Sequence, residues 1–427
     1  MLETRLWRRA LVLSMLCATP AAAADTVRGF SLTELGEFVY DANPAGSAKT
    51  EAQKRVDQLY ALGVRQINLH PRAVMRDPRG VEVIPVTPIA KRSAERRRYL
   101  RLMKYIHGKG MTVGIRPIFF VTDANGKTPV VEVQADGSKK VWWHGNIQPN
   151  DPNRWFDSFR DYLVHYLTVA RLGKADEFTI GAELYSMTVG VEDQWKEHPH
   201  GFPGRWRELL QLARKRLGPT TRIMYDINFT DDSFKAEGIV EVGGELARWK
   251  YRLADLADEK SEYWLDLKAF WEGLDAVGID MYRSLATDAQ PLPKDQDELV
   301  AALKVTSDRY AGQIDNILVE IQIALDADEP KRVVVKEVGF RSSPKGFVRP
   351  FEFTEAGEGL PVSIEHQAAA YQAVLESFWS SGFDWFGGIV FWDASVSPNL
   401  HGAEDRGFSP LGKKPSEEVV QRFFKEL

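Results

Sequence analysis

The stretch FTIGAELYSM, residues 178–187, is an apolar run that ends at a single carboxylate, Glu183. A run of this kind is typical of a buried strand in a parallel sheet. An ionised carboxylate is costly to bury without partners. A glutamate that ends such a strand is therefore either half of an ion pair or a group with a chemical role.

Short β-rich runs alternate with helical patterns from Thr26 onward, and no linker rich in proline, glycine or serine divides them. Such alternation is typical of a parallel sheet. Apolar residues at three- and four-residue spacing predict helices, for example at 154–172 and 366–382. Strands are predicted at eight places: TVRGF (26–30), VRQINLH (64–70), MTVGIRPIFF (111–120), EFTIGA (177–182), RIMYDIN (222–228), DAVGIDMY (275–282), RVVVKEV (332–338) and FGGIVFW (386–392).

Eight strands that are each followed by a helix predict an α/β fold, a (β/α)8 TIM barrel with extended βα loops, formed by residues 25–427 as one domain. The alternative is a doubly wound open sheet. The first connection, ELGEFVYDANPAGSA (34–48), lacks the Gly-x-Gly-x-x-Gly loop expected in that fold. Active sites of barrels lie at the carboxyl ends of the strands, so the polar residues there are the candidate site.

Two glutamates occupy such positions, because Glu183 ends the fourth strand and Glu337 ends the seventh. A structural role for either would require an ion pair across the barrel mouth. Glycoside hydrolysis requires two carboxyl groups that face one sugar: one protonates the departing oxygen and the other attacks the anomeric carbon. The pair therefore favours chemistry, and direct attack with retention predicts a separation of about 5–5.5 Å between the carboxyl groups.

Glutamates at the ends of strands four and seven resemble the arrangement of the retaining glycosidase clan with (β/α)8 barrels. The chain is more closely similar to glycoside hydrolase family 113, the β-1,4-mannanases, from about residue 142 to the C-terminus. Six stretches carry this resemblance: WWHGNIQPNDPNRWFDSFRDYLVHYLTVAR (142–171), FTIGAELYSM (178–187), WRELLQLARKRLGPTTRIMYDINF (206–229), GIDMY (278–282), VVVKEVGFRS (333–342) and GFSPLGKKP (407–415).

The resemblance implies that Glu183 is the acid/base and Glu337 the nucleophile. Glu337 must then be ionised while Glu183 stays protonated, so we expect Tyr282, which ends strand six, to donate its hydroxyl to Glu337 and hold the pKa of that carboxyl down. Many clan members place asparagine directly before the acid/base, whereas this chain has Ala182, whose side chain cannot hydrogen-bond. The preference at the sugar 2-position therefore stays open.

Tryptophans near the strand ends are candidates for stacking on flat sugar faces. Trp392 closes strand eight and is the foremost candidate, and Trp143 precedes strand four. Trp155 lies in a helical pattern and is expected in the core.

Further polar residues at strand ends are secondary candidates for substrate binding. One member of each neighbouring pair is expected to point into the barrel wall. Asn228 ranks above Asp226 because it lies nearer the mouth, and the family pattern has an asparagine there. Arg116 is either a substrate-facing cation or the partner of a neighbouring carboxylate. The complete set of secondary candidates is Arg116, His70, Asn228, Asp226, Asp280 and Asp393.

The N-terminal residues 1–24 read as a secretory signal peptide, which predicts a periplasmic or secreted protein. Arg5, Arg8 and Arg9 precede the apolar run ALVLSMLCAT (10–19), and PAAAAD (20–25) offers a cleavage site. No stretch approaches the roughly 18–20 apolar residues that a membrane span requires. Cys17, the single cysteine, is expected to leave with the signal.

The charge balance argues against nucleic acid as a partner. Signal removal takes three of 55 basic and one of 60 acidic residues, which leaves 52 against 59 and a net charge of −7. The one basic cluster, KRSAERRRYLRLMK (91–104), is expected to be the solvated face of a helix. The apolar side of that helix would carry Tyr99, Leu102, Met103 and Ile106.

The leading hypothesis is an exported, monomeric, retaining glycoside hydrolase that cleaves β-1,4-mannan or a related β-linked polysaccharide. The alternative is a non-catalytic glycan-binding barrel, which has no need of both carboxylates. A metal-dependent deacetylase would need ligands that the chain does not present, since EHPHGF (197–202) only places two histidines two residues apart in a loop. Neither a metal nor a cofactor is therefore expected. Inserted segments at 80–97, 235–253 and 342–361 would build the sugar subsites.

Overall fold

The computed structural model describes residues 26–33, 48–236, 239–352 and 359–426. The predicted signal peptide at residues 1–24, with Cys17, lies outside the described residues, as does part of the segment 342–361. No helix in the described part of the chain combines the length and the apolar character that a membrane span requires.

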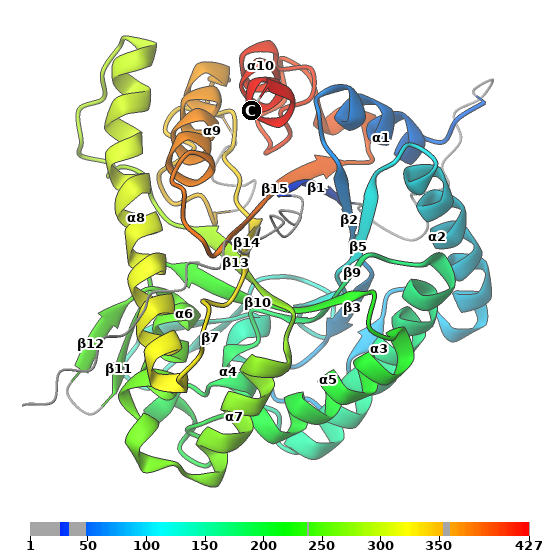
Figure 1. The fold of residues 1–427 in the computed structure, drawn as a ribbon, viewed down its shortest axis with the longest axis vertical. Helices are drawn as coiled ribbons and strands as arrows, with labels where there is room; N and C mark the ends of the chain where they lie inside the picture. Colours follow the sequence, from blue (N-terminus) through cyan, green and yellow to red (C-terminus); the bar gives the residue numbers. More distant parts are fainter. Residues whose placement is uncertain (1–25, 34–47, 237–238, 353–358, 427) are drawn as a thin grey trace, which may run out of the picture.

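Eight parallel strands close into a barrel (Figure 1), and their order around the ring follows the chain. β1 pairs with both β2 and β15, which closes the sheet and excludes the open-sheet alternative. All eight predicted strands contribute, so the predicted (β/α)8 barrel is confirmed. The barrel strands are β1 (Val27–Thr33), β2 (Gln66–Leu69), β5 (Thr112–Ile115), β9 (Glu177–Ala182), β10 (Arg222–Thr230), β13 (Ala276–Tyr282), β14 (Val333–Glu337) and β15 (Phe386–Ser395).

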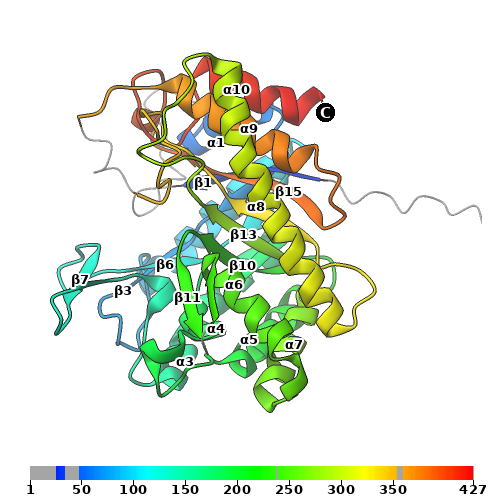
Figure 2. The same ribbon diagram turned by 90° about the vertical axis from the view of Figure 1, so that its left-hand side faces the viewer.

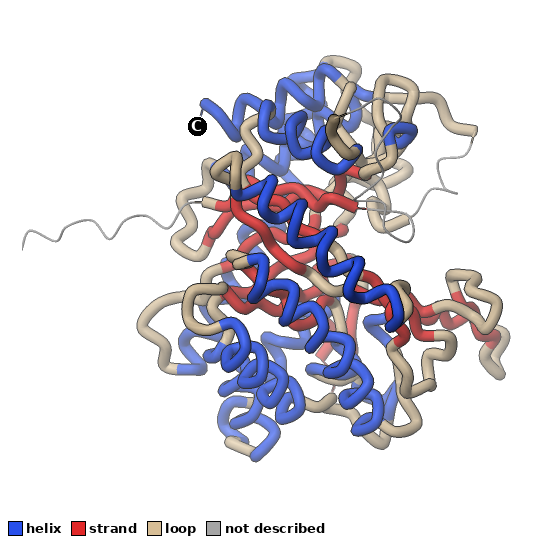
Figure 3. Tube along the Cα trace, turned by 90° about the vertical axis from the view of Figure 1, so that its right-hand side faces the viewer, coloured by secondary structure: helices blue, strands red, loops and turns tan. Residues whose placement is uncertain are grey.

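Helices surround the barrel and form the outer layer of the molecule (Figure 3). The helices predicted at 154–172 and 366–382 are α3 and α9. In α2 the buried residues include Tyr99, Leu102, Met103 and Ile106, as predicted for the basic segment. The helices are α1 (Glu51–Ala61), α2 (Arg92–His107), α3 (Pro152–Gly173), α4 (Tyr185–Thr188), α5 (Pro203–Leu217), α6 (Gly244–Lys250), α7 (Glu262–Gly273), α8 (Gln296–Leu325), α9 (Ile364–Trp379) and α10 (Lys414–Gln421).

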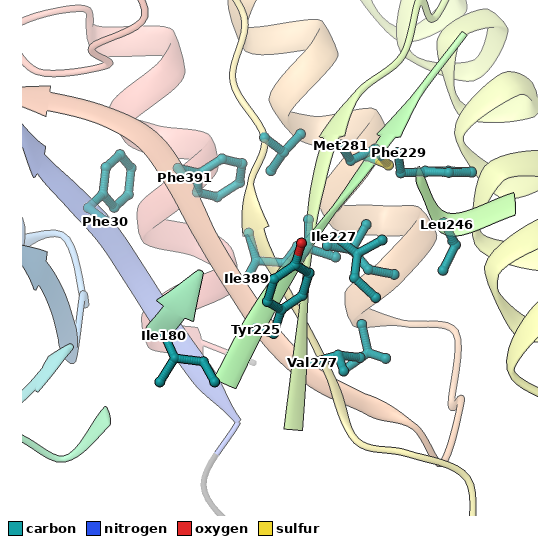
Figure 4. Packing of buried hydrophobic residues seen from close by; sticks show 14 of the residues in the cluster. Phe30, Ile180, Tyr225, Ile227, Phe229, Leu246, Val277, Met281, Ile389 and Phe391 are labelled. Atoms are coloured by element: carbon teal, nitrogen blue, oxygen red, sulfur yellow. The ribbon is translucent and has the colours of Figure 1, made fainter. Parts of the chain in front are cut away.

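The main hydrophobic core fills the space between the barrel strands and the surrounding helices (Figure 4). Phe30 of β1 and Phe391 of β15 are register partners, and their ring centroids lie 5.4 Å apart. Ile227 and Val277 add apolar side chains from the neighbouring strands β10 and β13. Leu246 of the short helix α6 belongs to the same cluster, so this inserted helix packs firmly against the barrel.

The third predicted strand, 111–120, is divided in two at Arg116 and Pro117. The barrel strand β5 ends at Ile115, and β6 (Ile118–Val121) leaves the barrel to pair with β3 (Arg72–Met75), which also pairs with β4 (Ile84–Pro85). Proline has no N–H to donate to a neighbouring strand, so the ladder breaks there. The break places Arg116 at the carboxyl end of β5.

Two hairpins extend the βα connections beyond the barrel. β7 (Val130–Val133) pairs with β8 (Lys139–Trp142) in the connection after β6, and Figure 2 shows β7 projecting away from the barrel. β11 (Ser233–Ala236) pairs with β12 (Ile239–Val242) in the connection after β10. The second hairpin and α6 occupy the predicted insertion at 235–253, whereas the first was not among the predicted insertions.

Candidate active site

Glu183 follows the last residue of β9 in a left-handed backbone conformation, with φ of 55°. This conformation is disfavoured by roughly 1–2 kcal/mol for a residue that carries a Cβ atom. Backbone strain of this kind persists where the surroundings impose it, and it concentrates at functional sites. The Glu183 N–H donates to the carbonyl of Asp226 at 2.8 Å, which holds the turn against β10.

Both carboxyl oxygens of Glu183 have partners, and the residue is only 9% exposed. Asn228 Nδ2 donates to Oε1 at 2.7 Å, and His144 Nε2 lies 3.0 Å from Oε2. His144 begins a 3₁₀ turn directly after the β7–β8 hairpin. The ring centroids of Phe119 and Trp143 lie 6.0 and 4.8 Å from that of His144, so the imidazole is packed in place.

Glu337, the last residue of β14, is 8% exposed and also has both oxygens engaged. Tyr282 donates its hydroxyl to Oε2 at 2.8 Å, which is the predicted bond between the end of strand six and the end of strand seven. Arg116 Nη1 donates to Oε1. Glu337 thus accepts from a guanidinium, which can only donate, and from a hydroxyl. Glu183 accepts from an amide and lies beside an imidazole.

Arg116 lies at the centre of a buried ion cluster and is 2% exposed. Its Nε and Nη2 donate to Asp226 Oδ2 and Asp280 Oδ2, each at 2.5 Å, in addition to the bond to Glu337. A Cβ atom at Gly278 would lie 2.1 Å from Asp226 Oδ1, so glycine is required there to make room for the carboxylate. Of the two alternatives for Arg116, the structure therefore has the carboxylate partner and not the substrate-facing cation.

The two glutamates have displaced pKa values in opposite directions. Burial raises the pKa of Glu337 to about 7, and the charge of Glu183 adds to the rise, although Arg116 and Tyr282 act to lower it. Burial also opposes ionisation of Glu183, but the hydrogen bond and charge of His144, with Asn228, outweigh it and lower the pKa of that carboxyl. Tyr282 acts on the pKa of Glu337 in the expected direction, but burial outweighs it, because Arg116 is shared among three carboxylates. The expected order, with Glu337 ionised while Glu183 stays protonated, is therefore wrong for the free site.

The two candidate stacking tryptophans are half-buried, so part of each ring surface remains accessible. Trp143 lies beside His144, with its ring centroid 5.7 Å from that of Tyr185. Trp392 lies in β15, and its centroid is 5.2 Å from that of His70. Trp155 is fully buried in the core and stacks on Phe159, as expected.

His70 and Asp280 are fully buried, which does not suit direct contact with a sugar. His70 supports Trp392 from below the mouth, and Asp280 accepts from Arg116. Asn228 reaches Glu183 while Asp226 binds Arg116, so the ranking of Asn228 nearer the mouth agrees with the structure.

Two residues next to this cluster were missed in the sequence. His144 follows two tryptophans in a loop far from any predicted strand end, and Glu245 lies in an insertion whose course no pattern specified. Only the tertiary fold brings them to Glu183. Within the described ranges, no group of three or more His, Cys, Asp or Glu side chains is arranged to hold a metal ion.

Comparisons with known proteins bear on the family resemblance and on the fold. Residues 37–200 match the model of Glycoside Hydrolase Family 113. The matched segment includes Glu183 and begins upstream of the six stretches that carry the resemblance. No curated protein gives a significant sequence match. At identities below 20%, the likeness to the solved structures described next shows the fold alone.

A complex of a family 113 β-1,4-mannanase is 17% identical, with a TM-score of 0.58 over 94% of this chain and 100% of that chain. A family 113 β-mannanase from Alicyclobacillus acidocaldarius is also 17% identical, with a TM-score of 0.59 over 94% and 97%. A family 5 mannosidase from Rhizomucor miehei is 10% identical, with a TM-score of 0.51 over 93% and 92%. With the match of residues 37–200 to the family model, these findings confirm the predicted resemblance to a mannanase-like glycoside hydrolase, and they confirm the (β/α)8 barrel fold.

Proposed function

We propose that the chain is an exported, retaining glycoside hydrolase that cleaves β-1,4-mannan or a related β-linked polysaccharide. Residues 25–427 would form one monomeric catalytic domain after removal of the signal peptide. The observation that carries the proposal is the pair of buried glutamates at the carboxyl ends of β9 and β14, each with its own set of partners. A barrel that only binds glycan has no need of two such carboxyl groups.

Double displacement assigns one role to each glutamate. In the first step a Glu337 oxygen attacks the anomeric carbon, the glycosidic bond breaks, and the departing oxygen takes the proton of Glu183. In the second step the Glu183 carboxylate takes a proton from water, and the water oxygen attacks the anomeric carbon and releases Glu337. Both carboxyl groups are then back in their starting forms.

The surroundings of Glu183 offer a place for the proton that the first step needs. Both oxygens of Glu337 face donors, whereas Glu183 Oε2 faces a histidine nitrogen that can donate or accept, depending on its tautomer. With His144 neutral and Nε2 unprotonated, the Glu183 carboxyl can keep its proton and donate it to His144. With Nε2–H, the imidazole stabilises the ionised form of Glu183, and the charge of Glu183 then favours protonation of Glu337, in keeping with the raised pKa of that carboxyl.

Mannan is the first substrate to test because of the family resemblance, since solved relatives bear the names β-1,4-mannanase and mannosidase. Ala182 leaves the contact to the sugar 2-hydroxyl open, so other β-linked glycans belong in the same screen. Trp143 and Trp392, both half-buried, are proposed to stack on sugar rings on the two sides of the glutamate pair.

The experiment is digestion of a panel of β-linked polysaccharides by the protein lacking residues 1–24. Product anomers are followed by NMR during the first turnovers, and retention of the β-configuration is expected. Glu183→Gln and Glu337→Gln are the matched controls, and each should abolish cleavage while binding to the same glycan persists. A glycan that binds without being cut, with equal affinity for the wild type and both variants, would favour the non-catalytic barrel instead.

A further inference from the structure

Glu245 is a carboxyl group with 0% exposure that the double displacement does not use. It lies in the inserted helix α6, and two of its side-chain hydrogen bonds reach residues that bond Glu183 or the adjacent Leu184. Its Oε2 accepts from the backbone N–H of Asn228 at 3.1 Å. Its Oε1 lies 2.9 Å from the Tyr225 hydroxyl and accepts from Trp249 Nε1 at 3.0 Å.

One branch of this network leads through Asn228 to a carboxyl oxygen of Glu183. Glu245 fixes the Asn228 backbone, and Thr230 Oγ1 donates to Asn228 Oδ1 at 3.1 Å, which orients the amide. Asn228 Nδ2 is thereby directed at Glu183 Oε1. Gly244 permits the close approach, since it has φ of 58° and an added Cβ atom would lie 2.4 Å from Asn228 Oδ1.

The other branch leads through Tyr225 to the backbone that follows Glu183. The N–H of Leu184 donates to the Tyr225 hydroxyl at 3.0 Å, and that hydroxyl lies 2.8 Å from Thr188 Oγ1. Thr188 Oγ1 in turn donates to the Leu184 carbonyl at 2.8 Å. The strained residue Glu183 is therefore held on both sides, at its carboxyl group by one branch and at its peptide chain by the other.

We propose that Glu245 is a positioning residue for Glu183, and that α6 was inserted where it delivers this carboxyl group to the site. The inference rests on the proposed function, in which Glu183 is the acid/base. General-acid catalysis requires the proton donor within hydrogen-bond reach of the leaving oxygen. Loss of Glu245 would release both branches at once, whereas loss of Asn228 or Tyr225 alone would release one.

The protonation state of Glu245 fits this role. Burial raises the pKa of the Glu245 carboxyl to about 8, with the nearby charge of Glu183 adding to the rise. The neutral form keeps every bond, because its O–H can donate to the Tyr225 hydroxyl, which then donates to Thr188. A neutral Glu245 also spares Glu183 a second negative charge, which would otherwise oppose its ionisation as a base.

The test compares Glu245→Ala and Glu245→Gln on aryl glycosides of the sugar that the chain cleaves. With a 4-nitrophenyl or alkyl leaving group that needs protonation, Glu245→Ala should lower kcat/KM by roughly 10- to 100-fold, as a misplaced catalytic group does. With a 2,4-dinitrophenyl group, which leaves unaided, kcat/KM should change less than about threefold because the first step no longer needs the acid. Glu245→Gln mimics the neutral carboxyl and should recover most of the loss.

The matched control is Glu95→Ala. Glu95 is a buried carboxyl of α2 whose three side-chain partners, Thr87, His165 and Tyr166, do not include either of the two glutamates. Its replacement should lower stability without any dependence of kcat/KM on the leaving group. Equal losses on both substrates for Glu245→Ala, or no loss on either, would overturn the inference.

A second measurement needs no substrate. Hydrogen exchange should show the amides of Leu184 and Asn228 exchanging at least roughly tenfold faster in Glu245→Ala than in the wild type. The Asn228 N–H loses its direct acceptor, and the Leu184 N–H loses the carboxyl group that holds its acceptor, the Tyr225 hydroxyl, in place. Amides of the distant strand β2 should not change. If the wild type cut no glycan, the proposed function would fail, but this comparison would still test the positioning role. Unchanged exchange at both amides would contradict that role.

Discussion

The Tyr282 hydroxyl donates to Glu337 Oε2 at 2.8 Å, joining the end of β13 to the end of β14. This bond lowers the pKa of Glu337, but burial and the charge of Glu183 leave that pKa at about 7. The carboxyl that attacks the sugar is therefore only partly ionised at neutral pH. Because the pKa of Glu183 lies below that of Glu337, the competent form, with Glu337 ionised and Glu183 protonated, is a minor species between the two pKa values. Its fraction falls once the pH exceeds the pKa of Glu337, so kcat/KM should fall as the pH rises through about 7.

Tyr282→Phe should move this alkaline limb to higher pH. The variant removes a donor that favours the charged form, so the pKa of Glu337 rises further, and a hydrogen bond to a charged group corresponds to a shift of roughly one to two pH units. The measurement is the pH profile of kcat/KM. Tyr162→Phe is the control, since that buried hydroxyl donates to the Pro71 and Ile118 carbonyls away from the glutamates. A limb that stays in place in Tyr282→Phe would contradict the assignment of Glu337 to it.

His144 should govern the acid limb. The hydrogen bond and charge of His144 counter the effect of burial and lower the pKa of Glu183. Below that pKa both carboxyl groups are protonated and Glu337 cannot attack, so activity is lost as the pH falls through the lower pKa of the pair. His144→Ala removes both effects and should shift this limb to higher pH. His144→Gln keeps a neutral donor and should give a smaller shift, and identical profiles for all three proteins would rule out this role.

The buried ion cluster predicts a large loss of stability on removal of its cation. Arg116→Met leaves Asp226, Asp280 and Glu337 without their shared partner, and breaking a buried ion pair in this way costs about 3–5 kcal/mol in the free energy of unfolding. Urea denaturation measures the loss. Adding Asp226→Asn and Asp280→Asn to Arg116→Met should recover part of it, because the neutral amides are less costly to bury. A single variant as stable as the wild type would show that the cluster does not hold the barrel mouth together.

Chelation should leave activity unchanged. Two carboxyl groups suffice for double displacement, so exhaustive treatment with EDTA should not alter kcat on the glycan that the protein cleaves. Zinc-dependent recovery after a loss would revive the deacetylase alternative, which release of acetate from an acetylated glycan would then test.

The sequence predicted the barrel and both glutamates because those features follow local rules. Each strand is a short apolar run, and a strand-end position can be read without knowing what lies opposite it. Arg116 could be placed at a strand end in the same way, but its choice of carboxylate partners over substrate depended on its distance from Asp226 and Asp280 across the barrel. His144 reaches Glu183 from the turn after a hairpin, and Glu245 reaches the Glu183 partner Asn228 from an inserted helix. No spacing in the sequence specifies where such segments return.

Azide rescue separates the roles of the two glutamates. Identical side chains do different work only if their surroundings differ, and here one faces His144 and Asn228 while the other faces Arg116 and Tyr282. With Glu183→Ala, an activated aryl β-glycoside leaves without help and Glu337 still forms the covalent intermediate. Azide, small enough to enter the vacated space, should then attack that intermediate and restore turnover as a β-glycosyl azide.

With Glu337→Ala the intermediate cannot form, so azide should attack the substrate directly from the face that the nucleophile occupied and give the α-glycosyl azide. Protonation by Glu183 remains available in this variant, so the less activated 4-nitrophenyl glycoside should also respond to azide, whereas Glu183→Ala should require the 2,4-dinitrophenyl substrate. NMR of the purified azides identifies the anomer. The same anomer from both variants, or the two anomers exchanged, would show that the acid/base is not at the end of β9 and the nucleophile not at the end of β14.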